Sequence, residues 1–253
     1  MTRWTALGRA VAMSAIVLCS APVRGEPADP CAVPGYLLFG DSQLDRVHAA
    51  VKKDKELRIV ALGGLSSTLP GPEGASFAYP ARLEAALARR LPGIKVSVTA
   101  VTKPRVTADK MAESIDQLLL DQKPSLVVWQ TGTYDAMRGT APEEFRASVS
   151  DGVEKLQEGG ADVVLVNMQY SPRTETMISA PPYLDNMRVV AQQYDVPLFD
   201  RFAIMRHWND AGDFDLYSAS HGLDLAKRVH DCIGRALAKF VIEAARVNPA
   251  QQN

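Results

Sequence analysis

The chain is poor in cysteine and has almost no net charge. It contains three cysteines in 253 residues, and its 28 basic and 29 acidic side chains leave a formal charge of -1. No cysteines or histidines recur at the spacing of a metal site, so we expect neither a metal nor another cofactor. No long run of like charge occurs, and nothing therefore indicates a nucleic-acid partner or an anionic membrane surface.

Internal repeats, low-complexity stretches and interdomain linkers are also missing between residues 57 and 246. The composition, 47% hydrophobic and 23% charged, is that of an ordinary globular protein. The length suffices for one well-buried domain. We therefore expect an N-terminal arm and helix over 26–56, a single domain over 57–246 and a disordered tail over 247–253.

The first 25 or so residues have the features of a secretory signal peptide. Arg3 and Arg9 give a positive start, and the apolar run from Ala10 to Cys19 is too short to span a bilayer. Cleavage after Ala21 or Gly25 would deliver a periplasmic or secreted protein without an integral membrane segment. An uncleaved anchor is the alternative.

Signal cleavage would leave two cysteines, Cys31 and Cys232. An even pair in an exported chain suggests one disulfide, between the N-terminal arm and the C-terminal helix. Cys232 also lies on the apolar stripe of that helix, so two buried free thiols are the alternative.

The stretch over residues 57–68, L-R-I-V-A-L-G-G-L-S-S-T, is the one around which the chain is organised. Its first half is a nearly all-apolar run of the kind that a parallel strand needs when helices cover both faces. The two glycines allow a sharp turn, and three hydroxyls follow. Ser66 after such a turn is a candidate nucleophile. Hydroxyls that only satisfy backbone groups are the alternative.

Apolar strands and amphipathic helices alternate from this stretch onward. Strands are predicted over 59–62, 96–101, 125–130, 161–167 and 196–199, and helices over 79–91, 107–119, 140–156, 183–194 and 225–237. Thr107 can cap one helix, and Thr140 with Glu143 forms a capping-box pattern for another. Such alternation predicts βαβ units with right-handed crossovers, and hence a parallel sheet covered on both sides.

Residues 40–44 spell a literal G-D-S-x-L. They precede the first strand and lead into a polar helix predicted over 43–53, without a turn of the phosphate- or oxyanion-binding type. Ser42 would lie at an edge of the sheet, away from the strand ends where α/β sites assemble. We therefore expect Ser42 to be uninvolved in catalysis.

The loops that follow the strands resemble those of the SGNH (GDSL-type) hydrolase family, over about residues 57–240. G-x-S-x-T is retained over 64–68, and G-x-x-D is retained over 132–135. The segments F-A-Y-P-A-R-L, W-Q-T-G-T and V-P-L-F-D-R-F are similar to those of exported bacterial members. The resemblance implies a three-layer α/β/α sandwich whose five-stranded parallel sheet has the flavodoxin-like order 2-1-3-4-5.

The resemblance also implies a serine ester hydrolase that acts on a small-molecule or glycan ester. It assigns the nucleophile to Ser66 or to a neighbouring residue. It further implies that His221 and Asp224 form an acid–base pair. The oxyanion site and pocket are expected to be formed by four residues: Gly64, Gly132, Tyr134 and Asp135.

Several positions depart from the family pattern. Leu65 replaces an aspartate, Tyr134 replaces the oxyanion asparagine, and the loop after the second strand has no glycine. The last block reads H-G-L-D, with acid and base in exchanged places. Because one lost oxyanion donor costs about 2.7–4 kcal/mol, two losses together cost roughly 5–8 kcal/mol if the terms add. A non-catalytic relative that binds an acylated or glycan ligand, or an envelope protein, is therefore the alternative function.

For the remaining charged and aromatic residues we expect structural, surface or ligand-binding roles rather than catalytic ones. We expect Tyr134 to be a pocket wall and Asp135 to hold its own loop. Three cations could gather around an anionic or sugar-acid ligand, with solvated surface charge as the alternative: Lys103, Arg105 and Arg173. Three histidines without partner spacing are expected to be structural: His48, His207 and His230.

Overall fold

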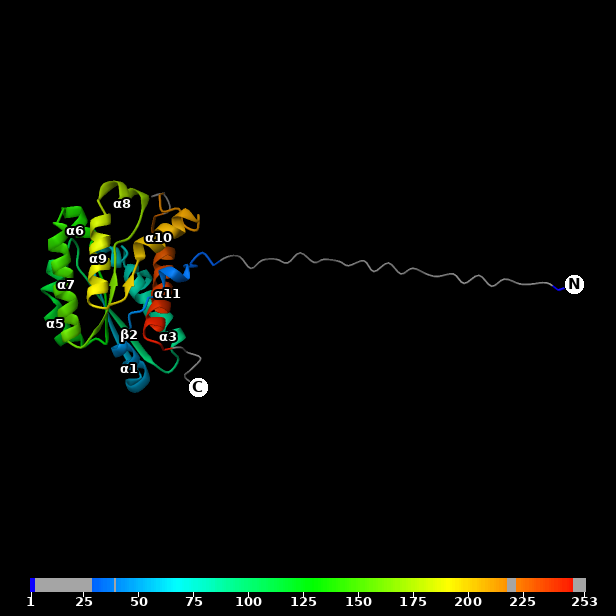
Figure 1. Ribbon diagram of the computed structural model, residues 1–253, viewed down its shortest axis with the longest axis horizontal. Helices are drawn as coiled ribbons and strands as arrows, with labels where there is room; N and C mark the ends of the chain where they lie inside the picture. Colours follow the sequence, from blue (N-terminus) through cyan, green and yellow to red (C-terminus); the bar gives the residue numbers. More distant parts are fainter. Residues whose placement is uncertain (3–28, 39, 218–221, 248–253) are drawn as a thin grey trace.

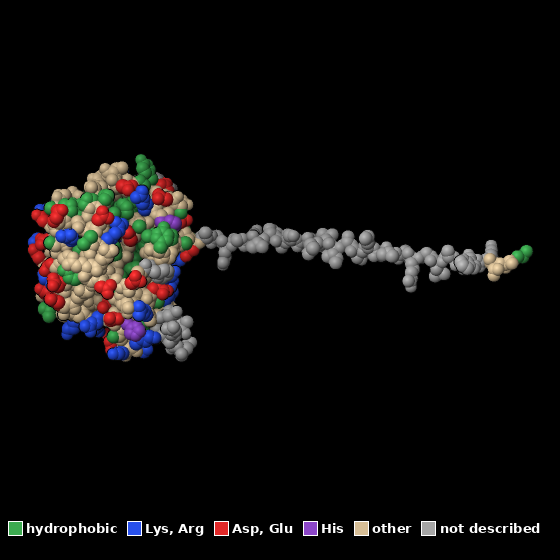
Figure 2. Space-filling model, viewed as in Figure 1, with side chains coloured by type: hydrophobic (Ala, Val, Ile, Leu, Met, Phe, Trp, Pro, Cys, Tyr) green, Lys and Arg blue, Asp and Glu red, His purple; other side chains and the backbone are tan. Residues whose placement is uncertain are grey.

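The structure is a computed structural model that describes residues 1–2, 29–38, 40–217 and 222–247. Most of the predicted signal peptide and of the predicted tail lies outside the described residues, as does His221. Within the described part of the chain, no helix is long and apolar enough to cross a bilayer. Acidic and basic side chains are interspersed over the face shown in Figure 2, in keeping with the small net charge.

The five predicted strands form one sheet in the predicted order. They are β1 (Glu56–Gly63), β2 (Lys95–Thr102), β3 (Leu126–Gln130), β4 (Asp162–Val166) and β5 (Leu198–Phe199). The order is β2-β1-β3-β4-β5, and every neighbouring pair is parallel. Side chains along β1, β3 and β4 are almost all buried, as expected of strands covered on both faces.

Helices cover both faces of the sheet, which confirms the predicted three-layer sandwich (Figure 1). In one layer α3 (Tyr79–Arg90) packs against α11 (Gly222–Ala244). In the other, α7 (Pro142–Glu158) packs against α4 (Ala108–Ala112), α5 (Ile115–Gln122) and α9 (Pro181–Gln193). The elements not predicted are the ten-residue helix α10 (Arg201–Asp210) and five short elements: η1 (Gly35–Leu37), η3 (Leu65–Ser67), α2 (Gly74–Phe77), α6 (Thr133–Arg138) and α8 (Pro172–Met177).

The apolar stripe of α7 shows how the helices attach to the sheet. Phe145, Val149 and Val153 recur at helical spacing, and all three are fully buried. Gly152 on the same helix lets the indole of Trp129 approach closely, because a Cβ there would lie 2.2 Å from the ring. Packing of this face, rather than intrinsic helix propensity, holds α7 in place.

The predicted capping box of α7 does not form. The N-cap is Ala141, and no side chain caps the helix. Pro142 has no N–H to satisfy, and the backbone oxygen of Thr140 instead accepts a hydrogen bond from the Tyr183 hydroxyl at 2.6 Å. This contact from α9 holds the backbone before the helix, and the first N–H groups of α7 have no side-chain cap.

Thr107 is the N-cap residue of α4, as predicted, but its side chain makes no capping bond. The single helix predicted over 107–119 is divided into α4 and α5. The Ser114 hydroxyl donates to the backbone oxygen of Met111 at 2.8 Å, where the two helices meet. A serine that bonds back to the preceding turn commonly interrupts a helix in this way.

The N-terminal arm packs into the same hydrophobic core as the sheet. Its predicted helix is α1 (Asp45–Ala49), continued by a π-helical turn, η2 (Ala50–Asp54). The side chains of Leu44, Val47 and Val51 are buried beside those of the strands.

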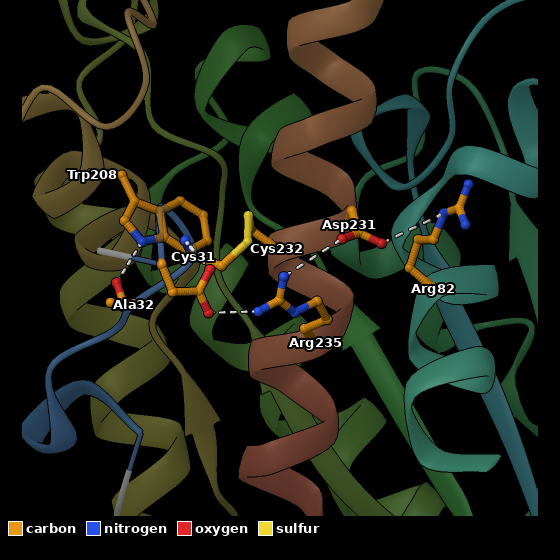
Figure 3. The surroundings of a disulfide bond; sticks show 8 residues. Cys31, Ala32, Arg82, Trp208, Asp231, Cys232 and Arg235 are labelled. Carbon is orange, nitrogen blue, oxygen red and sulfur yellow. Dashed lines mark hydrogen bonds and ion pairs between the residues drawn. A yellow bond between two sulfur atoms is a disulfide. The ribbon is translucent and has the colours of Figure 1, made fainter. Parts of the chain in front are cut away.

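Cys31 and Cys232 form a disulfide, the first of the two predicted alternatives, with their Cα atoms 5.0 Å apart. It joins the arm to the middle of α11 (Figure 3). The Trp208 indole N–H donates to the Ala32 backbone oxygen at 2.8 Å, and Arg235 is ion-paired with Asp29 at 2.6 Å. The arm is therefore fixed to the domain at several points.

Candidate active site

A cavity of about 490 Å³ opens at the carboxyl edge of the sheet. The loops after β1, β2, β3 and β4 contribute to its wall, together with the first turns of α11. Convergence of these loops follows from the parallel order, because the carboxyl ends of all the strands point the same way. Four of the seven predicted site residues line the cavity, namely Gly64, Ser66, Gly132 and Tyr134.

The other predicted residues lie elsewhere or outside the described part of the chain. Asp224 is exposed in the first turn of α11 and does not line the cavity. His221 falls outside the described residues. Both carboxyl oxygens of Asp135 are 3.2 Å from the Ala108 backbone nitrogen, which donates to them, and burial raises the pKa of Asp135. Asp135 thus ties the loop after β3 to the start of α4.

Ser66 lies in the single 3-10 turn that follows β1. Its Oγ accepts a hydrogen bond from the side-chain amide of Gln130, the last residue of β3. Gln130 Oε1 in turn accepts from the Ser67 hydroxyl and from Arg201, each at 2.8 Å. Because two donors occupy its oxygen, the amide can only turn its N–H group toward Ser66. The Ser66 proton is then free to point to a base or a ligand.

Gly63 makes this close arrangement possible. A Cβ at Gly63 would lie 2.2 Å from Ser67 Oγ, so any larger residue would displace the serine that holds Gln130. Gly132 has a φ of +97°, a left-handed conformation that residues with a Cβ rarely adopt. Both glycines are therefore required by the geometry of the site.

Arg201 places a buried positive charge beneath Ser66. Only 1% of the residue is exposed, and Nη1 donates to the Ser66 backbone oxygen at 2.9 Å as well as to Gln130. The guanidinium lies 5.6 Å from the ring centre of Tyr79, and no carboxylate in the described part of the chain pairs with it. Burial lowers the pKa of Arg201 to about 10, so the group stays charged at neutral pH. Its field favours negative charge developing at the cavity.

His230, which was expected to be structural, also lines the cavity. Its Nδ1 accepts a hydrogen bond from the backbone N–H of Tyr79 at 2.9 Å, at the start of α3. Burial, followed by the charge of Arg201, lowers the pKa of His230 to about 3. The ring is therefore neutral with its proton on Nε2, and it is not available as a general base.

Gln130, Arg201 and His230 were not identified from the sequence. Gln130 ends a predicted strand within the W-Q-T-G-T segment, and Arg201 lies in V-P-L-F-D-R-F, but the resemblance gave neither residue a role. Arg201 and His230 lie on helices and reach the site through packing, so their neighbours in the sequence do not indicate their contacts.

The literal G-D-S-x-L lies at the opposite, amino edge of the sheet. Ser42 Oγ donates to the Asp195 carboxylate at 2.8 Å, just before β5. The next residues pair with the far end of α11, where the Leu44 backbone nitrogen donates to the Ala244 oxygen. Ser42 is therefore remote from the cavity, as expected.

A family model described as the non-GDSL lipase-like family matches residues 30–247. Esterase TesA of Pseudomonas aeruginosa strain PAO1 is 36% identical over 55 residues, which are 22% of this chain and 27% of TesA. The chain thus aligns in sequence with about a quarter of that relative.

Solved structures agree with the fold. The crystal structure of TesA has a TM-score of 0.54 at 21% identity, covering 71% of this chain and 98% of TesA. A putative lipolytic protein of the G-D-S-L family from Desulfitobacterium hafniense DCB-2 has a TM-score of 0.55 at 17% identity, covering 74% and 99%. AlinE4, an SGNH-hydrolase family esterase, has a TM-score of 0.50 at 23% identity, covering 74% and 84%. With its parallel sheet, its serine after β1 and its match over residues 30–247, the chain belongs to the non-GDSL lipase-like family.

Proposed function

We propose that the protein is an exported ester hydrolase in which Ser66 is the nucleophile. One observation carries the proposal: the Ser66 hydroxyl lies at the wall of the 490 Å³ cavity, above a buried guanidinium and with its proton uncommitted. A hydroxyl whose oxygen accepts an amide hydrogen bond in a positive field can release its proton to a base more readily than an isolated serine.

His221 is proposed as that base, with Asp224 as the acid that orients it. His221 would accept the Ser66 proton during attack on the ester carbonyl and then donate it to the leaving alcohol. Water would hydrolyse the resulting acyl-enzyme by the reverse proton path. The residues of α11 that follow His221 and Asp224 support this placement, because Ala226 and His230 line the cavity.

The oxyanion is proposed to form beside Gly64, Gly132 and Tyr134. The phenol of Tyr134 would take the place of the amide that the family uses. Arg201 contributes through its field and through Gln130, since it does not itself line the cavity. A buried charge of this kind strengthens every interaction that develops negative charge nearby.

Export is proposed from the N-terminal sequence. The positive start, the short apolar run and the candidate cleavage positions support it. The Cys31–Cys232 disulfide agrees with an oxidising compartment such as the periplasm or the medium.

Ester turnover by the mature protein tests this proposal. Short-chain aryl esters and acetylated glycans are to be assayed with the wild type, Ser66→Ala, His221→Ala and His230→Asn. We expect turnover in the wild type, loss in the first two variants and partial activity in His230→Asn, which keeps an acceptor for the Tyr79 N–H. Loss confined to His230→Asn would refute His221 as the base.

A non-catalytic binding protein is the second candidate, and one specific observation favours it. Among the described residues of the cavity wall, no carboxylate is present, and His230 cannot accept a proton at the engaged Nδ1. Without His221 in place, nothing would activate Ser66. Background rates in all four proteins, together with binding of an acylated ligand in the cavity, would support this function.

A further inference from the structure

Among the described residues, the wall of the cavity carries positive charge and no negative charge. Arg105 is the ionised residue that lines it in the described part of the chain, and no Asp or Glu does so. With Arg201 buried beneath Ser66, the potential inside the cavity is positive.

Arg105 is held in an unusual conformation and has no internal partner. Its φ is +52°, the left-handed region that L-residues other than Asn and Asp seldom occupy. Its side chain is exposed and makes no ion pair or hydrogen bond with any described residue. Backbone outliers of this kind persist where the surrounding structure fixes them, and they cluster at ligand sites. Arg105 therefore offers a complete guanidinium to a ligand.

Two hydroxyls inside the cavity also lack partners. Thr131 Oγ1 and Thr133 Oγ1 are buried without a hydrogen bond, and both residues line the cavity. Thr131 is only 3% exposed. A buried hydroxyl without a hydrogen bond is unfavourable, and an oxygen of a bound ligand would supply the missing partner.

Apolar side chains form another part of the same wall. Leu69, Val106 and Met111 are buried residues that line it. The cavity thus combines an apolar stretch, unpartnered hydroxyls and a cation at its rim. A ligand that matches all three has a hydrocarbon part, polar oxygens and a negative charge.

We propose that the site selects esters that carry an anionic group, which pairs with Arg105 while the hydrocarbon part lies along Leu69, Val106 and Met111. That the ligand is an ester which the protein hydrolyses rests on the proposed function. That the ligand carries an anionic group does not, because a non-catalytic site with the same wall would bind the same ligands.

Matched ester pairs test the selectivity. The 4-nitrophenyl monoester of suberic acid and its methyl ester differ by a charge on the acyl part. The pair 4-acetoxybenzoate and methyl 4-acetoxybenzoate differ by a charge on the leaving group. We expect kcat/KM to favour the anionic member of at least one pair in the wild type, and the pair concerned shows which side of the ester faces Arg105.

Three variants assign the selectivity to Arg105. Arg105→Asn keeps a residue that tolerates the left-handed backbone but removes the charge, and Arg105→Lys restores the charge. Lys103→Gln removes an equal charge from an exposed position of the same loop that does not line the cavity. We expect the anionic-to-neutral ratio to fall about fivefold in Arg105→Asn only, as for a partly exposed ion pair. The ratio should also fall in the wild type at high salt.

Binding distinguishes failure of the inference from failure of the proposed function. Calorimetry with the mono-N-methylamide of suberic acid, which keeps one carboxylate and has an amide in place of the ester, is to be done on Ser66→Ala and on Ser66→Ala with Arg105→Asn. Turnover without charge preference, and equal binding by the two proteins, would overturn the inference and leave the esterase intact. Absent turnover with weaker binding in the double variant would support the inference and reject the esterase.

Discussion

Ser42 and Ser66 lie at opposite edges of one sheet, and the comparison between them separates sequence pattern from site. Ser42 lies in a complete G-D-S-x-L match, yet its hydroxyl donates a hydrogen bond to the Asp195 carboxylate at the amino edge. Ser66 follows a leucine where the family has aspartate, yet it lies in the cavity at the carboxyl edge. Position in a parallel sheet decides where loops converge, so it outweighs agreement with a short pattern.

The surroundings of the two serines differ in charge as well. The hollow beside Ser42, about 420 Å³, is lined by the acids Asp200 and Glu243 and by no cation of the described residues. The cavity of Ser66 has the opposite character, with Arg105 at its rim and Arg201 below. An ester oxygen gains negative charge during attack, and only the second environment stabilises that charge.

The largest expected difference between the two edges of the sheet is in ester turnover after each serine hydroxyl is removed. Ser66→Ala should lower ester turnover about 10⁴-fold or to background, because the nucleophile is lost. Ser42→Ala should leave turnover unchanged. Initial rates on an aryl acetate measure both variants, and a fluorophosphonate probe with peptide mapping identifies the labelled serine. Labelling at Ser42 would reverse the comparison.

Opening the disulfide should affect stability more than chemistry. The bond closes a separation of 201 residues, so Cys31→Ser with Cys232→Ser should lower the free energy of unfolding by about 4–5 kcal/mol. Urea denaturation measures this loss. Turnover per folded molecule should persist, because Ser66 lies outside the arm that the bond secures. Equal stability with and without the bond would contradict a structural role.

His230 gives the carboxyl edge a characteristic dependence on pH. Its pKa is about 3 in the fold against 6.5 for a free side chain, so the unfolded chain binds the extra proton first. The stabilisation is complete above pH 6.5 and is lost as the pH falls toward 3, by at most about 5 kcal/mol. His230→Asn should remove this slope in urea denaturation measured at several pH values. A ring resonance that titrates near pH 6.5 in the native protein would argue against it.

Asp162 should give the amino edge a smaller effect of opposite sign. This carboxyl begins β4 and accepts from the Val47 backbone nitrogen at 2.9 Å, and burial raises its pKa from 3.8 to about 6. The folded protein therefore binds the proton more tightly, and stability falls as the pH rises from 4 through 6. Asp162→Asn should remove that loss, roughly 1–2 kcal/mol after allowance for partial exposure. The same denaturation series checks it, and a variant less stable than the wild type at pH 8 would contradict the sign.

The sequence predicted the layered fold well because its signals were local and repeated. The all-apolar run of β1 indicates a strand covered on both faces, and the apolar stripe of α7 indicates a helix packed against the sheet. The alternation of strands and helices indicates a parallel sheet. Capping was predicted less well. Thr140 has the pattern of a cap, but Ala141 is the N-cap residue of α7 and no side chain caps the helix. The Thr140 backbone oxygen instead accepts a hydrogen bond from Tyr183 of α9. Local pattern competes with tertiary contact at helix ends, and the latter prevailed here.

The site was predicted only in part, for a related reason. Ser66, Gly132 and Tyr134 follow strands directly, so the resemblance located them in the cavity wall. Gln130 and Arg201 lie in the segments W-Q-T-G-T and V-P-L-F-D-R-F that resemble the family, but the resemblance did not say what their side chains contact. Arg201 and His230 come from α10 and α11, and only the packing of these helices brings them to the cavity.

The amino-acid sequence by itself determined the alternation of strands and helices, the parallel sheet and the edge of the sheet at which loops converge, because hydrophobic period and chain connectivity are local properties. The order of the strands followed from the family resemblance and not from these local patterns. Only the tertiary structure decided which polar groups meet at that edge. A buried guanidinium below Ser66 and a neutral imidazole at the cavity wall result from helices that pack from distant parts of the chain. Their charge states follow from burial, and burial is a property of the folded molecule as a whole.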